Sequence, residues 1–211
     1  MADQLVTDAR RFLSELADNN SRAWFLEHKA TFEDKLKAPA LGLLERLSAP
    51  LGKFMGAPVS TKLFRPNRDV RFSKDKTPYT LHLHMMWSVR AAAGGPGPAF
   101  FLGIGLEYLT AGGGIMAFDG QTLPLYRAAV DDAPGEWLDL VAAAQRSGFS
   151  LREPELKRVP APYDRDHPAA DLLRQKGFAV WRELAGASLQ AEAVAAFTGL
   201  LPLQRRLIAL H

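Results

Sequence analysis

The chain contains no cysteine among its 211 residues. This absence excludes disulfides, thiolate metal ligands and a cysteine nucleophile. A strong overall charge is also absent, because 26 Lys and Arg residues are balanced by 23 Asp and Glu residues, for a net charge of +3. The sequence has no apolar run long enough to span a bilayer and no basic and apolar leader at its N-terminus. We therefore expect a cytoplasmic protein without a membrane partner.

The recognisable motifs of cofactor and nucleophile sites are missing as well. The glycines at 103–105 and 112–114 do not sit in a strand–GxGxxG–helix unit, and the sequence has no P-loop lysine motif and no GxSxG context. We therefore expect no cofactor, and the sequence assigns no reaction. A composition of 47% hydrophobic and 23% charged residues is that of a globular protein, and the length suits a single domain over residues 1–211.

Apolar residues at helical spacing predict helices at both ends of the chain. Asn19 and Asn20 precede the second of these helices and are interpreted first as helix caps. A role for either residue in a pocket is the lesser alternative. The predicted helices cover residues 5–17, 21–37, 41–47, 123–130, 137–146, 168–176 and two stretches of 191–210 around Pro202.

The middle of the chain has the pattern of a sheet. In the predicted strand of residues 81–89, Leu81, Leu83 and Met85 alternate with His82, His84 and Met86, which is the period of a strand. The predicted strands cover residues 59–64, 70–72, 81–89, 100–109, 114–118 and 178–184, with a tight turn at 112–114 and a hairpin at 149–159. Helices at both ends with strands between them predict an α+β fold with a mainly antiparallel central sheet.

The positive charge is concentrated in one segment. Residues 62–82 contain six basic residues and two acidic ones, Asp69 and Asp75, whereas residues 1–61 are neutral and residues 83–211 have a charge of −1. A focused positive site attracts phosphates or carboxylates better than a diffuse charge does, and arginine can hold such a group at two points. The predicted ligand-binding residues are Arg65, Arg68, Arg71, Lys74, Lys76 and Tyr79.

The sequence therefore predicts binding of a phosphate-bearing or other anionic ligand, such as a small molecule or nucleotide, at Arg65–Tyr79. If residues 68–72 form a strand, Arg68 and Phe72 share one face and Asp69 and Arg71 the other. Asp69 would then orient an arginine, and Tyr79 would stack on the ligand or donate a hydrogen bond to it.

Three alternatives remain open for this segment. The first is an enzyme that acts on a phosphorylated substrate, with Asp69 and His82 as acid and base. The second is a nucleic-acid binder, which the sequence favours less because most of its four Trp and four Tyr residues lie outside the basic segment. The third is a structural or partner-binding module in which the arginines are paired internally. The oligomeric state is open, because the Ala- and Leu-rich C-terminal helices suit either an interface or core cover.

His82 and His84 lie two residues apart on a predicted strand, so their side chains point the same way. Two imidazoles need further ligands to hold a metal, and we predict no metal site. The dipeptide Lys157-Arg158 has two interpretations. Its loop either folds over the first basic segment or is a solvated hairpin, and the second interpretation is favoured.

Several motifs together resemble the bacterial and fungal family catalogued as domain of unknown function 2461. They are residues 19–25, Phe64–Tyr79 with His82 behind it, Leu156–Pro160, and Asp166–Pro168. The resemblance extends over about residues 10 to 205 and implies no settled activity. One departure is Thr80, where the family pattern leads us to expect lysine.

Overall fold

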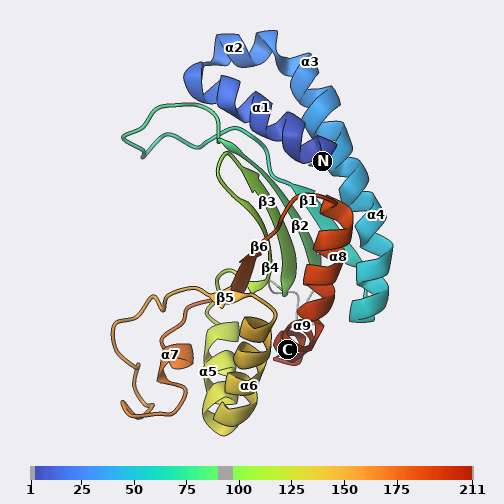
Figure 1. Cartoon of the computed structure of the whole chain (residues 1–211). Helices are drawn as coiled ribbons and strands as arrows, with labels where there is room; N and C mark the ends of the chain where they lie inside the picture. Colours follow the sequence, from blue (N-terminus) through green and yellow to red (C-terminus); the bar gives the residue numbers. More distant parts are fainter. Residues whose placement is uncertain (1–2, 90–96, 211) are drawn as a thin grey trace.

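The computed structural model describes residues 3–89 and 97–210. Helices occupy both ends of the chain and strands lie between them (Figure 1). The N-terminal elements are α1 (Gln4–Asp18), α2 (Arg22–Glu27), α3 (Lys29–Thr31), the wide turn η1 (Phe32–Lys37) and α4 (Ala38–Met55). The central strands are β1 (Val59–Leu63), β2 (His82–Val89), β3 (Ala99–Gly105) and β4 (Leu109–Ile115). The remaining elements are α5 (Thr122–Asp132), α6 (Pro134–Arg146), β5 (Ser150–Leu151), α7 (Ala170–Leu173), β6 (Phe178–Glu183), α8 (Leu189–Gly199) and α9 (Leu201–Ile208).

The strands form one antiparallel sheet in the order β1-β2-β3-β4-β6-β5. Strands β1 to β4 pair with their neighbours along the chain, and β6 joins the sheet beside β4. An antiparallel sheet with helices at the two ends of the chain is an α+β fold, which confirms the predicted fold class. No helix in the described ranges is long and apolar enough to cross a membrane.

One face of the sheet forms the core. In β2 the buried side chains alternate with half-buried ones, as the sequence pattern predicted. Trp87 is fully buried, and its indole N–H donates to the carbonyl of Leu44 in α4 over 2.9 Å. Helices α1, α4, α8 and α9 contact this side of the sheet, and Figure 1 shows them along its convex side. We call this side the covered face.

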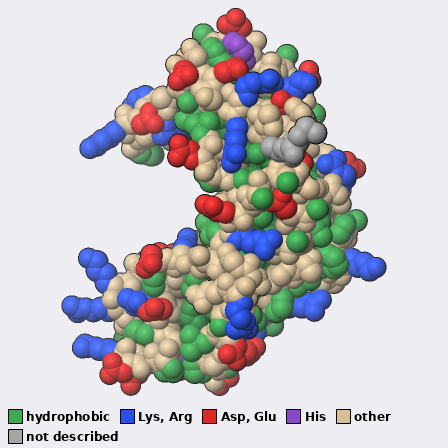
Figure 2. All heavy atoms as spheres, in the orientation of Figure 1, with side chains coloured by type: hydrophobic (Ala, Val, Ile, Leu, Met, Phe, Trp, Pro, Cys, Tyr) green, Lys and Arg blue, Asp and Glu red, His purple; other side chains and the backbone are tan. Residues whose placement is uncertain are grey.

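The opposite side, called the open face, contains the side chains of His82, His84, Met86 and Ser88 and the positions in register with them on the other strands. It borders the hollow of the molecule. Figure 2 shows this hollow between an upper projection, made by the β1–β2 connection, and a lower lobe, made by α5, α6, α7 and the loop of residues 152–169. Basic side chains project from both sides of the hollow in this view.

The predicted tight turn at residues 112–114 is wrong. These residues lie inside β4, and the β3–β4 hairpin turns at residues 106–108. The glycines provide space rather than a turn. A Cβ on Gly112 would lie 2.6 Å from the ring of Trp181, and a Cβ on Gly113 would lie 2.4 Å from the amide nitrogen of Gln204.

Three other local predictions need correction. Residues 70–72 form no strand, because the carbonyl of Val70 accepts from Lys76 Nζ and from the N–H of Ser73 instead of from a neighbouring strand. The hairpin expected at 149–159 is reduced to β5. The helix expected at 168–176 is shortened to α7, since the N–H of Lys176 donates to a carboxylate oxygen of Glu155 over 2.7 Å and draws the chain away.

Candidate functional site

The basic segment is a projecting loop of residues 64–81, here called the arm, which leaves β1 and returns to β2. Near the sheet, the outgoing and returning segments of the arm are joined by backbone hydrogen bonds. The N–H of Arg68 donates to the carbonyl of Pro78 over 2.8 Å, and the N–H of Thr80 donates to that of Pro66 over 2.7 Å. The arm therefore begins as a short two-stranded stem, although the sequence suggested a strand farther out.

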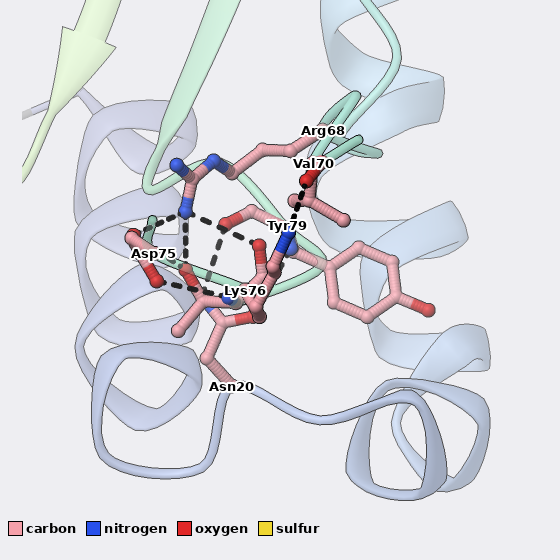
Figure 3. Close-up of polar contacts among 7 residues, drawn as sticks. Asn20, Arg68, Val70, Asp75, Lys76 and Tyr79 are labelled. Carbon is pink, nitrogen blue, oxygen red and sulfur yellow. Dashed lines mark hydrogen bonds and ion pairs between the residues drawn. The ribbon is translucent and has the colours of Figure 1, made fainter. Parts of the chain in front are cut away.

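Asn20 and Tyr79 anchor this stem to the N-terminal helices (Figure 3). The Asn20 side chain accepts from the backbone N–H of Tyr79 over 3.1 Å and donates to its carbonyl over 3.0 Å. The Tyr79 ring is 5% exposed and stacks on Phe25 with a centroid distance of 4.1 Å. Tyr79 thus has a structural contact where the sequence suggested a ligand contact. Ser21, rather than Asn20, caps α2.

Arg68 turns back into the arm, as Figure 3 shows. Its guanidinium donates to the Asp75 carboxylate, to the Thr77 hydroxyl, and to the Thr77 carbonyl over 3.2 Å. The backbone N–H of Thr77 also donates to Asp75 over 2.9 Å. These interactions lower the pKa of Asp75 to about 2, and the hydrogen bond from the Thr77 N–H contributes more than the one from the Arg68 guanidinium. Asp75 is therefore ionised at neutral pH and holds Arg68 in place.

Arg71 is held by Asp69 in a two-point ion pair, with nitrogen–oxygen distances of 2.9 Å and 2.6 Å. The Arg71 hydrogen bond lowers the pKa of Asp69, which makes this carboxylate a poor proton acceptor. That pairing weakens the alternative in which Asp69 and His82 act as acid and base. Lys76 donates to the Val70 carbonyl over 3.0 Å. Several of the basic side chains thus stabilise the arm itself.

A cavity of about 730 Å³ lies at the base of the arm, beside the sheet edge. We call it the basic cleft. Arg65 is exposed there, and its side chain makes no hydrogen bond with the residues that the structure describes. The acid lining the cleft is Asp69, which is already paired with Arg71. The residues that line the cleft are Lys62, Leu63, Phe64, Arg65, Asn67, Arg68, Asp69, Thr80 and His82.

The tip of the arm is a different surface. Phe72 is 96% exposed, and the Arg71 guanidinium lies 5.8 Å from its ring centre. Arg71, Lys74, Lys76 and Tyr79 do not line the basic cleft. The structure therefore divides the predicted ligand residues into a basal group of Arg65 and Arg68 and an outer or anchoring group. It adds Lys62, which the sequence counted in the charge excess but did not select.

His82 lines the basic cleft and stacks on His84 with a centroid distance of 3.8 Å. Burial lowers the pKa of both imidazoles, that of His84 to about 4. Both rings are therefore neutral at pH 7. His84 Nε2 lies 2.7 Å from the Tyr108 hydroxyl. Over residues 3–89 and 97–210, no three His, Asp or Glu side chains are grouped so as to hold a metal ion.

Lys157 and Arg158 line a separate cavity of about 490 Å³ in the lower lobe, with Arg165 and Arg174. Figure 1 shows the arm in the upper part of the molecule and the loop of residues 152–169 in the lower part, and in the same orientation Figure 2 shows the hollow between these parts. The alternative in which this loop folds over the first basic segment is therefore wrong. The favoured solvated hairpin is also not formed, since residues 152–169 are irregular.

The fold and the cleft define a class of protein: an α+β chain whose antiparallel sheet is covered on one side and open on the other, with a basic loop at its edge. Residues 8–201 match the family described as "Conserved hypothetical protein (DUF2461)". The chain belongs to this family. No curated protein matches the sequence.

Proposed function

We propose that the protein binds a phosphate-bearing or other anionic ligand in the basic cleft. The observation that carries the proposal is the set of cations around this cavity. Lys62, Arg65 and Arg68 line it, while its acid, Asp69, is neutralised by Arg71. A volume of about 730 Å³ lies within the usual range of small-molecule sites.

The three cations differ in the contacts that hold their side chains beside the cleft. Arg68 is held by Asp75 and Thr77 through one terminal nitrogen. Arginine has five N–H donors, so the other donors of Arg68 remain for an anion. Lys62 Nζ lies 4.6 Å from the ring centre of Phe64, which holds the ammonium at the sheet edge. Arg65 is the exposed member and provides a planar fork.

The test is calorimetric titration of the protein with inorganic pyrophosphate, at low and at moderate salt. Arg65→Gln removes one cation without breaking a hydrogen bond of the arm. We expect it to weaken pyrophosphate binding about 10-fold or more, because a hydrogen bond to a charged group contributes about 1.5–3 kcal/mol. Salt should weaken binding by the wild-type protein.

Arg146→Gln is the matched control, since it removes the same charge from an exposed residue of α6, in the lower lobe. We expect it to bind pyrophosphate as the wild type does. The proposal is overturned if the wild-type protein does not bind pyrophosphate. It is equally overturned if both variants weaken binding to the same extent, because the effect would then belong to net charge.

A further inference from the structure

A strip of aromatic rings on the open face adjoins the basic cleft. The ring of His84 lies 3.8 Å from that of His82, 6.4 Å from that of Phe64 and 6.1 Å from that of Tyr108, measured between centroids. His82 and Phe64 also line the cleft. The strip therefore begins inside the cleft and continues across the sheet to the β3–β4 hairpin.

The Tyr108 ring lies directly against the backbone of two glycines, Gly103 and Gly105. A Cβ on Gly105 would lie 2.2 Å from this ring, and a Cβ on Gly103 would lie 3.2 Å from it. Only residues without a side chain leave room for a ring this close to the strands. Tyr108 is half-buried. One side of the ring therefore lies against the backbone, and the ring remains partly accessible.

A second pair of rings continues this surface farther along the sheet. Phe101 and Trp181 stack with a centroid distance of 5.3 Å, and Trp181 lies over Gly112. Met86, Phe101, Gly112 and Trp181 are in register across β2, β3, β4 and β6. The open face thus combines flat rings with glycines that leave room for these rings against the backbone, and Phe101 is the buried member of the pair.

The two ends of this surface have charges of opposite sign. The cations Lys62, Arg65 and Arg68 gather at the arm end. The acidic residue Glu183 is in register with His84 across the sheet but lies three strands away from it. At the usual strand spacing this separation is about 14 Å. The rings between these ends are neutral, because burial lowers the pKa of His82 and His84 and raises that of Tyr108. An anionic group belongs at the arm end and an uncharged planar group beyond it.

We propose that the ligand of the basic cleft is a nucleotide, with its phosphates between Lys62, Arg65 and Arg68 and its base against the Tyr108 ring. This inference rests on the proposed function and names the class of ligand. A free nucleotide and the end of a single-stranded nucleic acid share this chemistry, since each joins a heteroaromatic base to phosphate. Stacking of a base on an aromatic side chain tolerates any base.

The experiment compares ADP with pyrophosphate on the same protein, because ADP contains the same diphosphate group together with a base and a sugar. We expect the wild type to bind ADP about 10-fold tighter than pyrophosphate, the gain typical of one stacked base. Tyr108→Leu should remove this gain and leave pyrophosphate affinity unchanged. Tyr163→Leu, a half-buried tyrosine of the lower lobe, is the matched control and should retain it.

The outcomes separate the two proposals. Equal affinity of the wild type for ADP and pyrophosphate overturns the nucleotide inference and leaves the anion site intact; this comparison needs no variant to fold. An ADP gain that survives in Tyr108→Leu overturns the placement of the base. Failure of pyrophosphate itself to bind overturns the proposed function. A short oligothymidylate that binds tighter than ADP identifies a strand end as the source, and weaker binding identifies a free nucleotide.

Discussion

The two faces of the sheet are built from alternate residues of the same strands, yet they differ in almost every physical respect. On the covered face, Leu83, Met85 and Trp87 are buried against helices. On the open face, His82 and His84 are half-buried and border a hollow. The comparison teaches that the two faces can be changed separately, because successive side chains of β2 point to opposite sides of the sheet.

The largest loss of stability is expected for a substitution on the covered face. Trp87→Ala removes a fully buried indole and its hydrogen bond to Leu44, so we expect the free energy of unfolding to fall by about 3–5 kcal/mol. Met86→Ala, one residue earlier and on the open face, should cost about 1 kcal/mol or less. Urea unfolding of both variants measures the difference. Equal losses would show that the two faces contribute equally to stability.

A smaller effect is expected where a glycine supports a ring of the open face. In Gly105→Ala the new methyl group would lie 2.2 Å from the Tyr108 ring. The ring must move and lose its 2.7 Å contact with His84, at a cost of about 1–3 kcal/mol. Gly120→Ala is the control, since among the described residues no heavy atom beyond its chain neighbours lies within 4 Å of its Cβ position. Thermal unfolding, with near-ultraviolet circular dichroism of the tyrosines, tests the pair; equal melting temperatures would contradict the prediction.

The last effect is a pH dependence that belongs to the open face and develops only in acid. Burial lowers the pKa of His84 from 6.5 to about 4, so between these values the unfolded chain binds more protons than the folded protein does. Stability is therefore complete above about pH 6.5 and is lost as the pH falls toward 4. His84→Gln should flatten this part of the curve of urea midpoint against pH. Parallel curves for variant and wild type would assign the loss to other groups.

The sequence predicted the features that depend on neighbouring residues. The alternation of Leu81 to Val89 correctly indicated β2 with one buried face, and helical spacing indicated α1, α8 and α9. The excess of positive charge at residues 62–82 marked the segment that forms the arm, although the sequence predicted a strand at 70–72 within it. The glycines at 112–114 led to a wrong prediction of a turn. The sequence alone does not distinguish a glycine that leaves room for a neighbouring side chain from a glycine that forms a turn.

The members of the site were harder to predict than its place in the chain. Arg65, Arg68 and Arg71 look equivalent in the sequence, but Asp75 holds Arg68 and Asp69 holds Arg71, while Arg65 stays exposed. Asn20 meets Tyr79 across 59 residues of chain. No local pattern encodes these choices of partner.

The aromatic strip has the same origin. The sequence disfavoured a stacking surface because most of its tyrosines and tryptophans lie outside the basic segment. Only the pairing of the strands brings Tyr108, in the β3–β4 turn, next to the ring of His84, and Trp181 next to that of Phe101. By itself, the sequence determined that helices occupy both ends of the chain, the buried face of β2 and the position of the charge, because periodicity and charge density are properties of short segments. The tertiary structure alone decided which cations face a cavity and which rings share a surface. Both depend on contacts between residues far apart in the chain, and those contacts are set when the sheet closes against its helices.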